Sequence, residues 1–581
     1  MRSYSKLLLV SLLSLLSAAP VSKTFEIFHI TDTHANIAGD PQNPGRASLP
    51  QVVEFHRHMN EQSKGATFFI HSGDITQGSA LSDADTPIPG LGNFLTHFAD
   101  PEFIATVGNH DLDNGIVDYT IEQSTNNTSV FKDRYIATNL FSTVNNSAPT
   151  PFTGTRFITK TVNGTKMLII GFLDETWTYK PSYVTLKKCA DSLDADFASY
   201  ATTADPDMVL VLQHSSITDG GKYLPQQAET VERIREVLGD DMPILFLNGH
   251  AHHWEESPCY YTNGTVAPNC YHRQGENNLR SIAFVNVNIT KLDNGSVTAN
   301  FTLTPRFDNN IKNVRSHMGL AEDAEFPCGS RCSAVNDTLN SLVNKIHPFD
   351  VLATSTRNYT RPSKPQNWLD RNCGYYLWNK YIHPIVYNGT DIFLINTGSV
   401  KGDIREGAVK LDNVFAFAPY SEHRATSSGV SAKTLYALVH KVAPSNEDPS
   451  SWADFFDGGD SFYLNPPLSS LDINKTYNLV HNTFDRARIA KAASIVGDTV
   501  TQNTDESIDL RSEIHKALIN GIQLDSALDE TTTPDNNEAD EKAKMPGWAW
   551  VLVAISIAIF AGIMVGSGCH LFKRQGKTAQ V

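Results

Sequence analysis

The sequence has no excess of positive charge and no Cys-x-x-Cys pairs of the kind that hold zinc clusters. Lysine and arginine number 47 against 63 aspartates and glutamates, which gives a net charge of −16 at pH 7. An acidic surface repels phosphate backbones, so a nucleic-acid partner held on a basic face is excluded. Glycine (36) and proline (28) are at ordinary levels and 40% of the 581 residues are hydrophobic, which excludes collagen-like, low-complexity and mostly disordered chains.

Long apolar runs occur at only two places, one near each end of the chain. Residues 1–20 have a basic start, a short apolar core and small residues, which predicts a signal peptide. Residues 547–572 are long and apolar enough to span a bilayer, and Trp548 and Trp550 stand at their entry. They predict a single transmembrane helix with a cytoplasmic tail at 573–581. We therefore expect a type I membrane protein of the secretory pathway, its body extracellular or in the lumen of the vacuole or lysosome.

Sequons and cysteines favour the same oxidising compartment. Six of the seven cysteines lie in the body of the chain and allow fifteen disulfide connectivities. Short separations favour Cys259–Cys270 and Cys328–Cys332. A Cys189–Cys373 bridge between domains is the remaining pairing, and we expect local bridges alone. Glycosylation sequons are spread over the body, at Asn127, Asn163, Asn263, Asn288, Asn300, Asn336, Asn358, Asn388 and Asn474.

Short apolar runs without polar alternation predict strands that are buried on both faces of a sheet. In the first half of the chain they alternate with longer amphipathic stretches, which is an α/β pattern. We place one α/β domain at 24–320, a connector with a helix at 321–350, a second α/β domain at 351–525 and an acidic stalk at 526–546. The strand-like runs of the first domain lie at 25–30, 66–71, 103–107, 167–172, 208–213 and 244–247.

Polar clusters directly follow five of these runs. Each cluster alone is an ordinary turn, cap or buried histidine. In open α/β sheets, however, ligands bind at the carboxyl ends of the strands, so five such clusters indicate one functional site. The clusters are Asp32-Thr33-His34, Gly73-Asp74, Gly108-Asn109-His110-Asp111, Gln213-His214 and Gly249-His250-Ala251-His252.

The order of these five clusters resembles that of the calcineurin-like metallophosphoesterase family. The resemblance implies two divalent metal ions (Zn, Mn or Fe), because imidazole and carboxylate ligands suit these metals better than calcium. It also implies that His110, positioned by Asp113, stabilises the transition state or protonates the leaving oxygen. Gln77 stands where purple acid phosphatases have a metal-binding tyrosine, which argues against a tyrosinate–iron site. The implied ligands are Asp32, His34, Asp74 and His252 for one ion and Asp74, Asn109, His214 and His250 for the other.

The second domain resembles the C-terminal domain of 5'-nucleotidases. The resemblance rests on the blocks Asn-Thr-Gly-Ser-Val-Lys at 396–401, Pro-Tyr at 419–420 and Gly-Gly-Asp-Ser-Phe at 458–462. Lysine replaces the arginine that usually ends the first block, and Asp454 stands where a second stacking ring is usual, so that Phe455 or Phe456 would substitute. The implied substrate-binding residues are Arg371, Asn396, Lys401, Tyr420, Phe455 and Asp460.

Together these patterns predict a membrane-anchored dimetal phosphohydrolase that resembles 5'-nucleotidases. Its metallophosphoesterase α/β sandwich would be followed by a substrate-binding α/β domain. The favoured reaction is hydrolysis of nucleoside 5'-monophosphates to nucleoside and phosphate. The alternatives are a nucleotide phosphodiesterase or pyrophosphatase, another phosphomonoesterase of the same fold, and an inactive adhesion or receptor ectodomain. Whether the protein forms a homodimer stays open.

Overall fold

The computed structural model describes residues 21–532, apart from short segments at 40–44, 114–115, 127, 145–147, 179, 220–221, 292–296, 362–369, 383–391, 397–399, 419–422, 445–448, 452–461 and 466–467. The predicted signal peptide, transmembrane helix and cytoplasmic tail lie outside the described residues. Across the part that is described, no helix combines the length and the apolar character needed to cross a membrane. The described residues up to Ser526 belong to one compact unit.

The first domain contains a seven-stranded sheet whose central strands are parallel. Strands β1 to β4 pair in parallel in chain order, and β16 adds to β1 in the antiparallel direction. The order is β17-β16-β1-β2-β3-β4, with β18 paired to β16. The strands are β1 (Val21–Ile30), β2 (Thr67–His71), β3 (Phe103–Thr106), β4 (Tyr135–Ile136), β16 (Ser281–Lys291), β17 (Val297–Leu303) and β18 (Phe307–Asp308).

A second sheet of six strands has the order β14-β15-β13-β10-β8-β7. Strands β8, β10, β13 and β15 are parallel, and antiparallel strands close both edges. The strands are β7 (Phe157–Val162), β8 (Thr165–Leu173), β10 (Met208–His214), β13 (Ile244–Asn248), β14 (Glu255–Tyr260) and β15 (Val266–Gln274). Small antiparallel sheets are formed by β5 (Leu140–Ser142), β6 (Thr150–Pro151) and β9 (Val184–Leu186), and by β11 (Thr218–Asp219) and β12 (Lys222–Tyr223).

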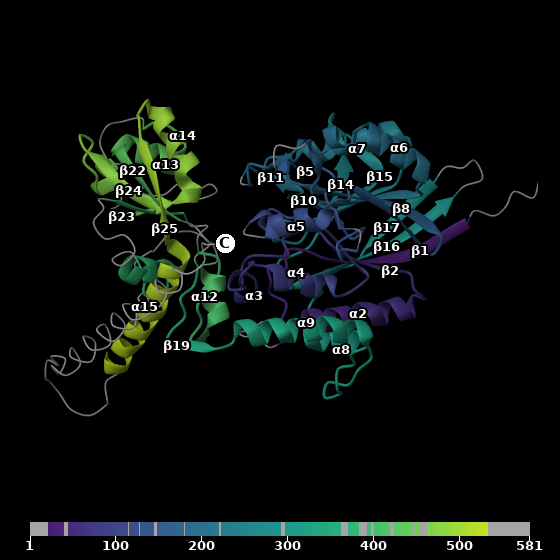
Figure 1. Cartoon of the computed structure of the whole chain (residues 1–581), viewed down its shortest axis with the longest axis horizontal. Helices are drawn as coiled ribbons and strands as arrows, with labels where there is room; N and C mark the ends of the chain where they lie inside the picture. The colour runs from purple at the N-terminus through teal and green to yellow at the C-terminus, as the bar shows by residue number, and fades with distance from the viewer. Residues whose placement is uncertain are drawn as a thin grey trace, which may run out of the picture. The chain divides into compact units, whose positions relative to one another are not determined.

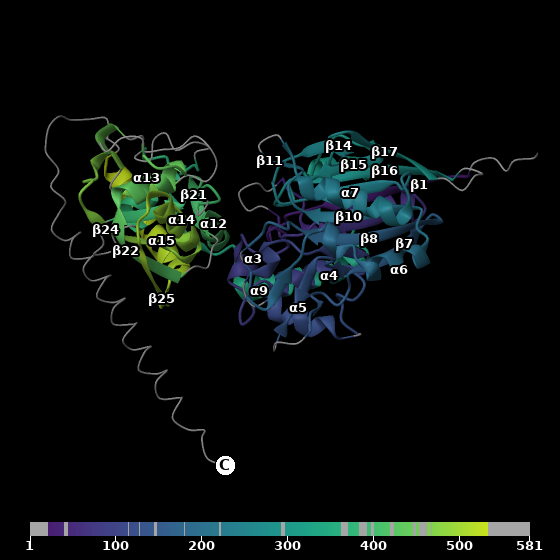
Figure 2. The same cartoon turned by 90° about the horizontal axis from the view of Figure 1, so that it is seen from above.

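The two large sheets pack face to face, and helices cover their outer faces (Figure 1). Buried side chains from both sheets, among them Ile70 and Leu210, form the core between them. Helix α7 lies over the second sheet in Figure 2. The result is the expected α/β sandwich, with helices α2 (Leu49–Gln62), α3 (Ala80–Asp83), α4 (Leu91–Phe98), α5 (Ile116–Ser124), α6 (Ala195–Ala204) and α7 (Pro225–Leu238).

The sequence explains both kinds of element locally. The six predicted strand runs become β1, β2, β3, β8, β10 and β13, and their inner residues are buried, as parallel strands covered on both faces require. Helix α2 begins after Ser48, whose backbone N–H donates to the Gln51 side chain at 2.8 Å in a capping box. It then buries Val52, Val53 and Phe55 against the first sheet.

The segment at 321–350 packs on the first domain through a long helix. It follows α8 (Ile311–His317) and contains α9 (Ser330–Ile346), whose Val335 and Leu339 join the core under α2 and α4. At the start of α9, Arg331 pairs with the buried carboxylate of Asp100 at 2.6 Å. These contacts hold α9 against the first domain, and the second domain begins after this helix.

The second domain is also α/β. Its five-stranded sheet has the order β23-β20-β24-β22-β25, and two helices, α13 and α14, cover one face. The strands of this sheet are β20 (Ile392–Asn396), β22 (His423–Ser431), β23 (Phe462–Asn465), β24 (Thr476–Asn482) and β25 (Thr501–Asp509). A separate antiparallel pair is formed by β19 (Val351–Ser355) and β21 (Gly407–Lys410). The helices are α10 (Gly374–Leu377), α12 (Leu411–Phe417), α13 (Ala432–His440), α14 (Arg486–Val496) and α15 (Leu510–Thr532).

The disulfides among the described cysteines are the two local ones that the short separations favour. Cys259–Cys270 joins β14 to β15, and Cys328–Cys332 links the segment before α9 to the first turn of that helix. Cys189 and Cys373 are free, buried thiols, which agrees with the prediction of local bridges for the cysteines that the structure describes. The described asparagines of five sequons are exposed: Asn163, Asn263, Asn300, Asn358 and Asn474.

A buried aspartate in α15 organises the polar interior of the second domain. The Asp525 carboxylate accepts hydrogen bonds from three tyrosine hydroxyls at 2.8–3.2 Å and faces three cations at 3.2–3.4 Å. Burial alone would raise the pKa of Asp525, but these hydrogen bonds outweigh it and lower the pKa to about 2. The six partners are Tyr359, Tyr376, Tyr381, Arg357, Arg371 and Lys380.

We expect Asp525→Asn to destabilise the second domain by about 3–5 kcal/mol at pH 7, because three cations would surround an uncharged amide. The folded pKa of Asp525 is depressed, so its contribution is present above the unfolded value of 3.8 and is lost as the pH falls through about 2. Urea unfolding between pH 7 and pH 2 should therefore show the two proteins converging in acid. The exposed Asp350→Asn serves as control, and equal stability at pH 7 would contradict the expectation.

Candidate metal centre

The predicted ligand residues all lie at the carboxyl ends of parallel strands. Asp32 and His34 follow β1, Asp74 follows β2, and Asn109 follows β3. In the second sheet His214 ends β10, and His250 and His252 follow β13. Because the two sheets pack with these ends on the same side, the seven side chains converge on one centre.

The donor atoms form two groups that share Asp74. One group is Asp32, His34, Asp74 and His252, the other contains Asp74, His214 and His250, and the donor atoms of each group lie within 4.8 Å of one another. The Asn109 Oδ1 atom joins the second group, at 2.7 Å from His250 Nδ1 and 3.2 Å from His214 Nε2. The predicted ligand sets are thus the sets that the fold brings together.

The charge of this centre fits divalent metal. Asp32 and Asp74 are almost completely buried, at 0% and 1% exposed. Burial alone would raise their pKa values, but His214 and its neighbours outweigh it and lower the pKa of both carboxyls. In return, the two carboxylates overcome the effect of burial on His214 and raise its pKa to about 10. Two buried carboxylates with nitrogen donors around them form a site that could hold a divalent cation.

The ligand residues lie in tight loops with an unusual backbone conformation. Five of the seven have φ between 47° and 79°, the left-handed region that non-glycine residues adopt at some energetic cost: Asp32, His34, Asp74, His250 and His252. The loops that hold them also approach closely. A Cβ atom on Gly108 would lie 2.0 Å from the Asp74 backbone nitrogen, which is why glycine is needed there.

Asp111 braces these loops, a role that the motif alone did not reveal. Its carboxylate accepts hydrogen bonds from the backbone N–H groups of Asp74, Ile75, Thr76 and Gly108, at 2.9–3.1 Å. Burial and the charge of Asp74 raise the pKa of Asp111 to about 7. The fourth position of the Gly-Asn-His-Asp block was the only sequence signal for it.

His110 and Asp113 form the predicted pair beside the ligands. The His110 Nδ1 atom lies 2.8 Å from the Asp113 carboxylate, and the backbone N–H of His110 donates to Asp74 at 2.8 Å. Burial lowers the pKa of His110 to about 4, and burial together with Asp74 raises the pKa of Asp113. Both shifts favour the uncharged form of each group, so one proton is shared between His110 Nδ1 and the Asp113 carboxyl.

Trp177 lies next to this pair and was missed by the sequence reasoning. Its half-buried ring contacts the rings of His110 and His250 edge to face, with centroids 6.5 and 6.3 Å apart. It follows β8 in a turn held by its own N–H donating to the Asp174 carbonyl at 3.1 Å. No motif marks this residue, since its relation to the site depends on how the two sheets pack.

Of the substrate-binding residues predicted in the second domain, the structure describes the side chains of two, Lys401 and Arg371. The positive charge of Lys401 is among the causes that lower the pKa of His110, so this lysine lies near the metal centre. The Arg371 guanidinium instead pairs with Asp525, at 3.2 Å. The remaining candidates lie outside the described residues or have side chains that are not described: Asn396, Tyr420, Phe455 and Asp460.

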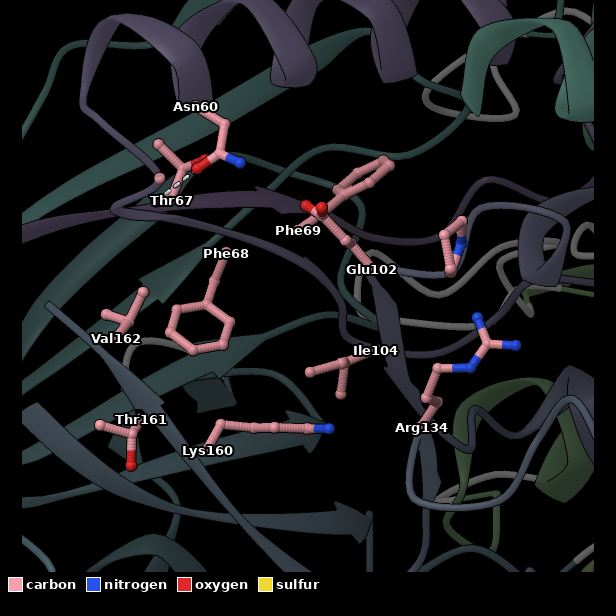
Figure 3. A pocket seen from close by; sticks show the side chains of 12 residues that line it. Asn60, Thr67, Phe68, Phe69, Glu102, Ile104, Arg134, Lys160, Thr161 and Val162 are labelled. Carbon is pink, nitrogen blue, oxygen red and sulfur yellow. Dashed lines mark hydrogen bonds between the residues drawn. The ribbon is translucent and has the colours of Figure 1, made fainter. Parts of the chain in front are cut away.

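A separate cavity of about 270 Å³ lies at the amino ends of β2 and β3, away from the metal centre (Figure 3). Phe68, Ile104 and Val162 give it an apolar wall, and Lys160 and Arg134 line it as well. None of its lining side chains belongs to either of the two donor groups found in the described part of the chain. The chemistry described above therefore belongs to the opposite end of the strands.

Comparison with known proteins supports the interpretation of the two donor groups as a metal centre. Residues 25–254 match the family model of calcineurin-like phosphoesterases. The uncharacterized protein YHR202W of Saccharomyces cerevisiae is 24% identical over 420 residues, which cover 68% of this chain and 66% of that relative, just under two thirds of its length. Residues 25–254 thus match a calcineurin-like phosphoesterase domain, and both donor groups lie within this span.

Solved structures extend the likeness over both domains. A 5'-nucleotidase from Candida albicans has a TM-score of 0.67 at 16% identity and covers 87% of this chain and 99% of its own. A 5'-nucleotidase precursor from Thermus thermophilus has a TM-score of 0.56 at 15% identity, with 86% and 96% covered. A sulfate thiohydrolase from Thermus thermophilus reaches 0.52 at 12% identity, with 86% and 94% covered. At these identities the likeness shows a two-domain fold of the 5'-nucleotidase type.

We expect His110→Asn to lower kcat by about 10²–10⁴-fold, because it removes the proton donor and leaves the ligands in place. Metal content measured by mass spectrometry should stay unchanged, which separates this loss from loss of a ligand. The exposed His253→Asn is the matched control, since His253 is a nearby histidine that pairs with Glu255 instead of Asp113. Full activity in His110→Asn would contradict the assignment.

Proposed function

We propose that the protein hydrolyses nucleoside 5'-monophosphates, or closely related nucleotides, to nucleoside and phosphate with two divalent metal ions. The second domain carries this proposal: it resembles nucleoside-binding domains in sequence, and its Lys401 lies near His110. The two-domain fold shared with 5'-nucleotidases along nearly the full length of those chains supports the same choice. A phosphoester at the metal centre would then be contacted from both domains.

The residues of the centre can be assigned to steps of the hydrolysis. Divalent ions bound there would polarise the phosphoryl oxygens and lower the pKa of a water molecule. The Asp32 and Asp74 side chains are held in place by the backbone N–H groups of His250 and His110, so their donor oxygens are fixed before substrate binds. His110 then donates a proton to the departing oxygen, and the charge of Lys401 favours the phosphate dianion.

The first test is phosphate release from a panel of nucleotides by the purified full-length protein. We expect release from AMP or a similar monophosphate, and a loss of several orders of magnitude in Asp74→Asn, because Asp74 is shared by both ligand groups. The exposed Asp196→Asn in α6 is the control. Release from generic phosphoesters but not from nucleotides would keep the metal centre and reject the nucleotide substrate.

Product analysis separates the enzyme alternatives. A phosphodiesterase or pyrophosphatase would cleave dinucleotides or sugar nucleotides and leave AMP intact, whereas a monoesterase releases phosphate from AMP directly. The inactive ectodomain of the sequence analysis is not retained, because the ligand set is complete and the phosphoesterase domain is present.

Trp177 should distinguish bulky from small leaving groups. Its ring offers a flat apolar surface beside His110, where the leaving group of the ester departs. We expect Trp177→Ala to lower kcat/KM for AMP by about 10-fold, mainly through KM, and to leave glycerol phosphate hydrolysis nearly unchanged. Trp177→Phe should keep most of the activity on AMP. An equal loss on both substrates would show that Trp177 serves only to pack the site.

We also propose that the protein enters the secretory pathway and is held in the membrane by the segment at 547–572. The composition of both apolar runs and the exposed sequon asparagines support this placement. Two disulfides are typical of an oxidising compartment. Glycosidase digestion and alkaline extraction of membranes from expressing cells test the two parts of the proposal.

A further inference from the structure

Metal-binding histidines usually donate their second ring N–H to an oxygen, which leaves the other nitrogen free for the metal. Two histidines of this centre follow that rule. The His34 Nδ1 atom lies 2.7 Å from the Gln77 carbonyl oxygen, and the His214 Nδ1 atom lies 2.7 Å from the Ser72 carbonyl oxygen. In both cases Nε2 is left as the donor to the cation.

His252 departs from the rule because its Nδ1 atom faces a nitrogen. The Asn277 Nδ2 atom lies 3.2 Å from it, while His252 Nε2 lies 3.3 Å from Asp32 and 3.0 Å from His34 Nε2. An amide NH₂ can only donate, so this arrangement places the ring proton on Nε2, the nitrogen that faces the other ligands. That tautomer cannot bind a metal through Nε2.

The other atom of the same amide supplies the missing acceptor. Asn277 Oδ1 is buried and has no hydrogen-bond partner among the residues that the structure describes. Turning the amide by 180° exchanges oxygen and nitrogen with almost no change of shape. The oxygen would then face His252 Nδ1 as the carbonyl oxygens of Gln77 and Ser72 face their own histidines.

We propose that Asn277 is a positioning residue of the metal centre, whose Oδ1 accepts the Nδ1–H of His252 and so fixes Nε2 as the metal-binding nitrogen. The loop that carries it is tied to the ligands. The backbone N–H of Asn278 donates to the Asp32 carbonyl at 2.7 Å, and the Asn36 amide bridges the His34 carbonyl and Asn278 Oδ1. These hydrogen bonds hold the loop of Asn277 in place beside Asp32 and His34.

This assignment goes beyond the motifs. Asn277 lies outside residues 25–254, the span of the family match, and belongs to none of the five polar clusters. It sits in the turn between β15 and β16, where its carbonyl accepts the Arg280 N–H at 3.1 Å. The turn contacts His252 because β15 runs parallel to β13, so the segments that follow the two strands lie at the same edge of the sheet.

Two substitutions separate the acceptor role from simple packing. Asn277→Leu keeps the approximate size and offers no acceptor, whereas Asn277→Asp offers only acceptors toward Nδ1–H. We expect Asn277→Leu to weaken binding of Zn²⁺ or Mn²⁺ about 10–100-fold, as loss of a partner behind a metal-binding histidine does. Asn277→Asp should bind as tightly as the wild type or more tightly.

Calorimetric titration of the metal-free full-length protein with each ion measures both affinity and the number of ions bound. The exposed Asn313→Leu is the control for the substitution itself, and the melting temperatures of the metal-free proteins show whether each variant is folded. Wild-type affinity in Asn277→Leu overturns the proposal, and so does an Asn277→Asp variant as weak as Asn277→Leu. The readout requires no substrate, so a wrong choice of substrate class does not affect it.

Discussion

The structure depends on two carboxylates that are buried within a few ångströms of each other. Removing Asp32 and Asp74 from water costs several kcal/mol each unless positive charge compensates them. Around them the chain places histidine nitrogens, backbone N–H groups and the brace formed by Asp111. The two carboxylates raise the pKa of His214, because a proton on this ring supplies positive charge that a metal ion would otherwise bring. Divalent metal bound at these residues would make the centre locally cationic within an acidic protein.

The sandwich provides the rigidity that this centre requires. Left-handed backbone at Asp32, His34 and Asp74 is costly, and it persists because fully paired parallel strands and a dry core hold the loops on both sides. The core lies between and outside the sheets, whereas the ligands lie at one end of the strands. Stability and chemistry are therefore carried by different residues, and the loops can differ while the sheets remain.

The sequence was sufficient wherever the signal is local. Buried parallel strands are continuous apolar runs, and each ligand block directly follows such a run, so the strands and the ligand sets could be predicted. Trp177, Asp111 and Asn277 act through contacts between segments far apart in the chain, for which no local pattern exists. The pairing of Arg371 with the buried Asp525 also joins distant segments and has no local signal, and its contact with substrate stays a prediction.

The fold alone does not choose the substrate, since a sulfate thiohydrolase shares it with 5'-nucleotidases. The choice must come from the groups that surround the reacting phosphorus atom. On one side Trp177 presents its ring beside His110, and Lys401 adds positive charge from the second domain. A small anionic head with a flat, bulky leaving group would satisfy both conditions at once, which is the form of the nucleoside monophosphates that we propose as substrates.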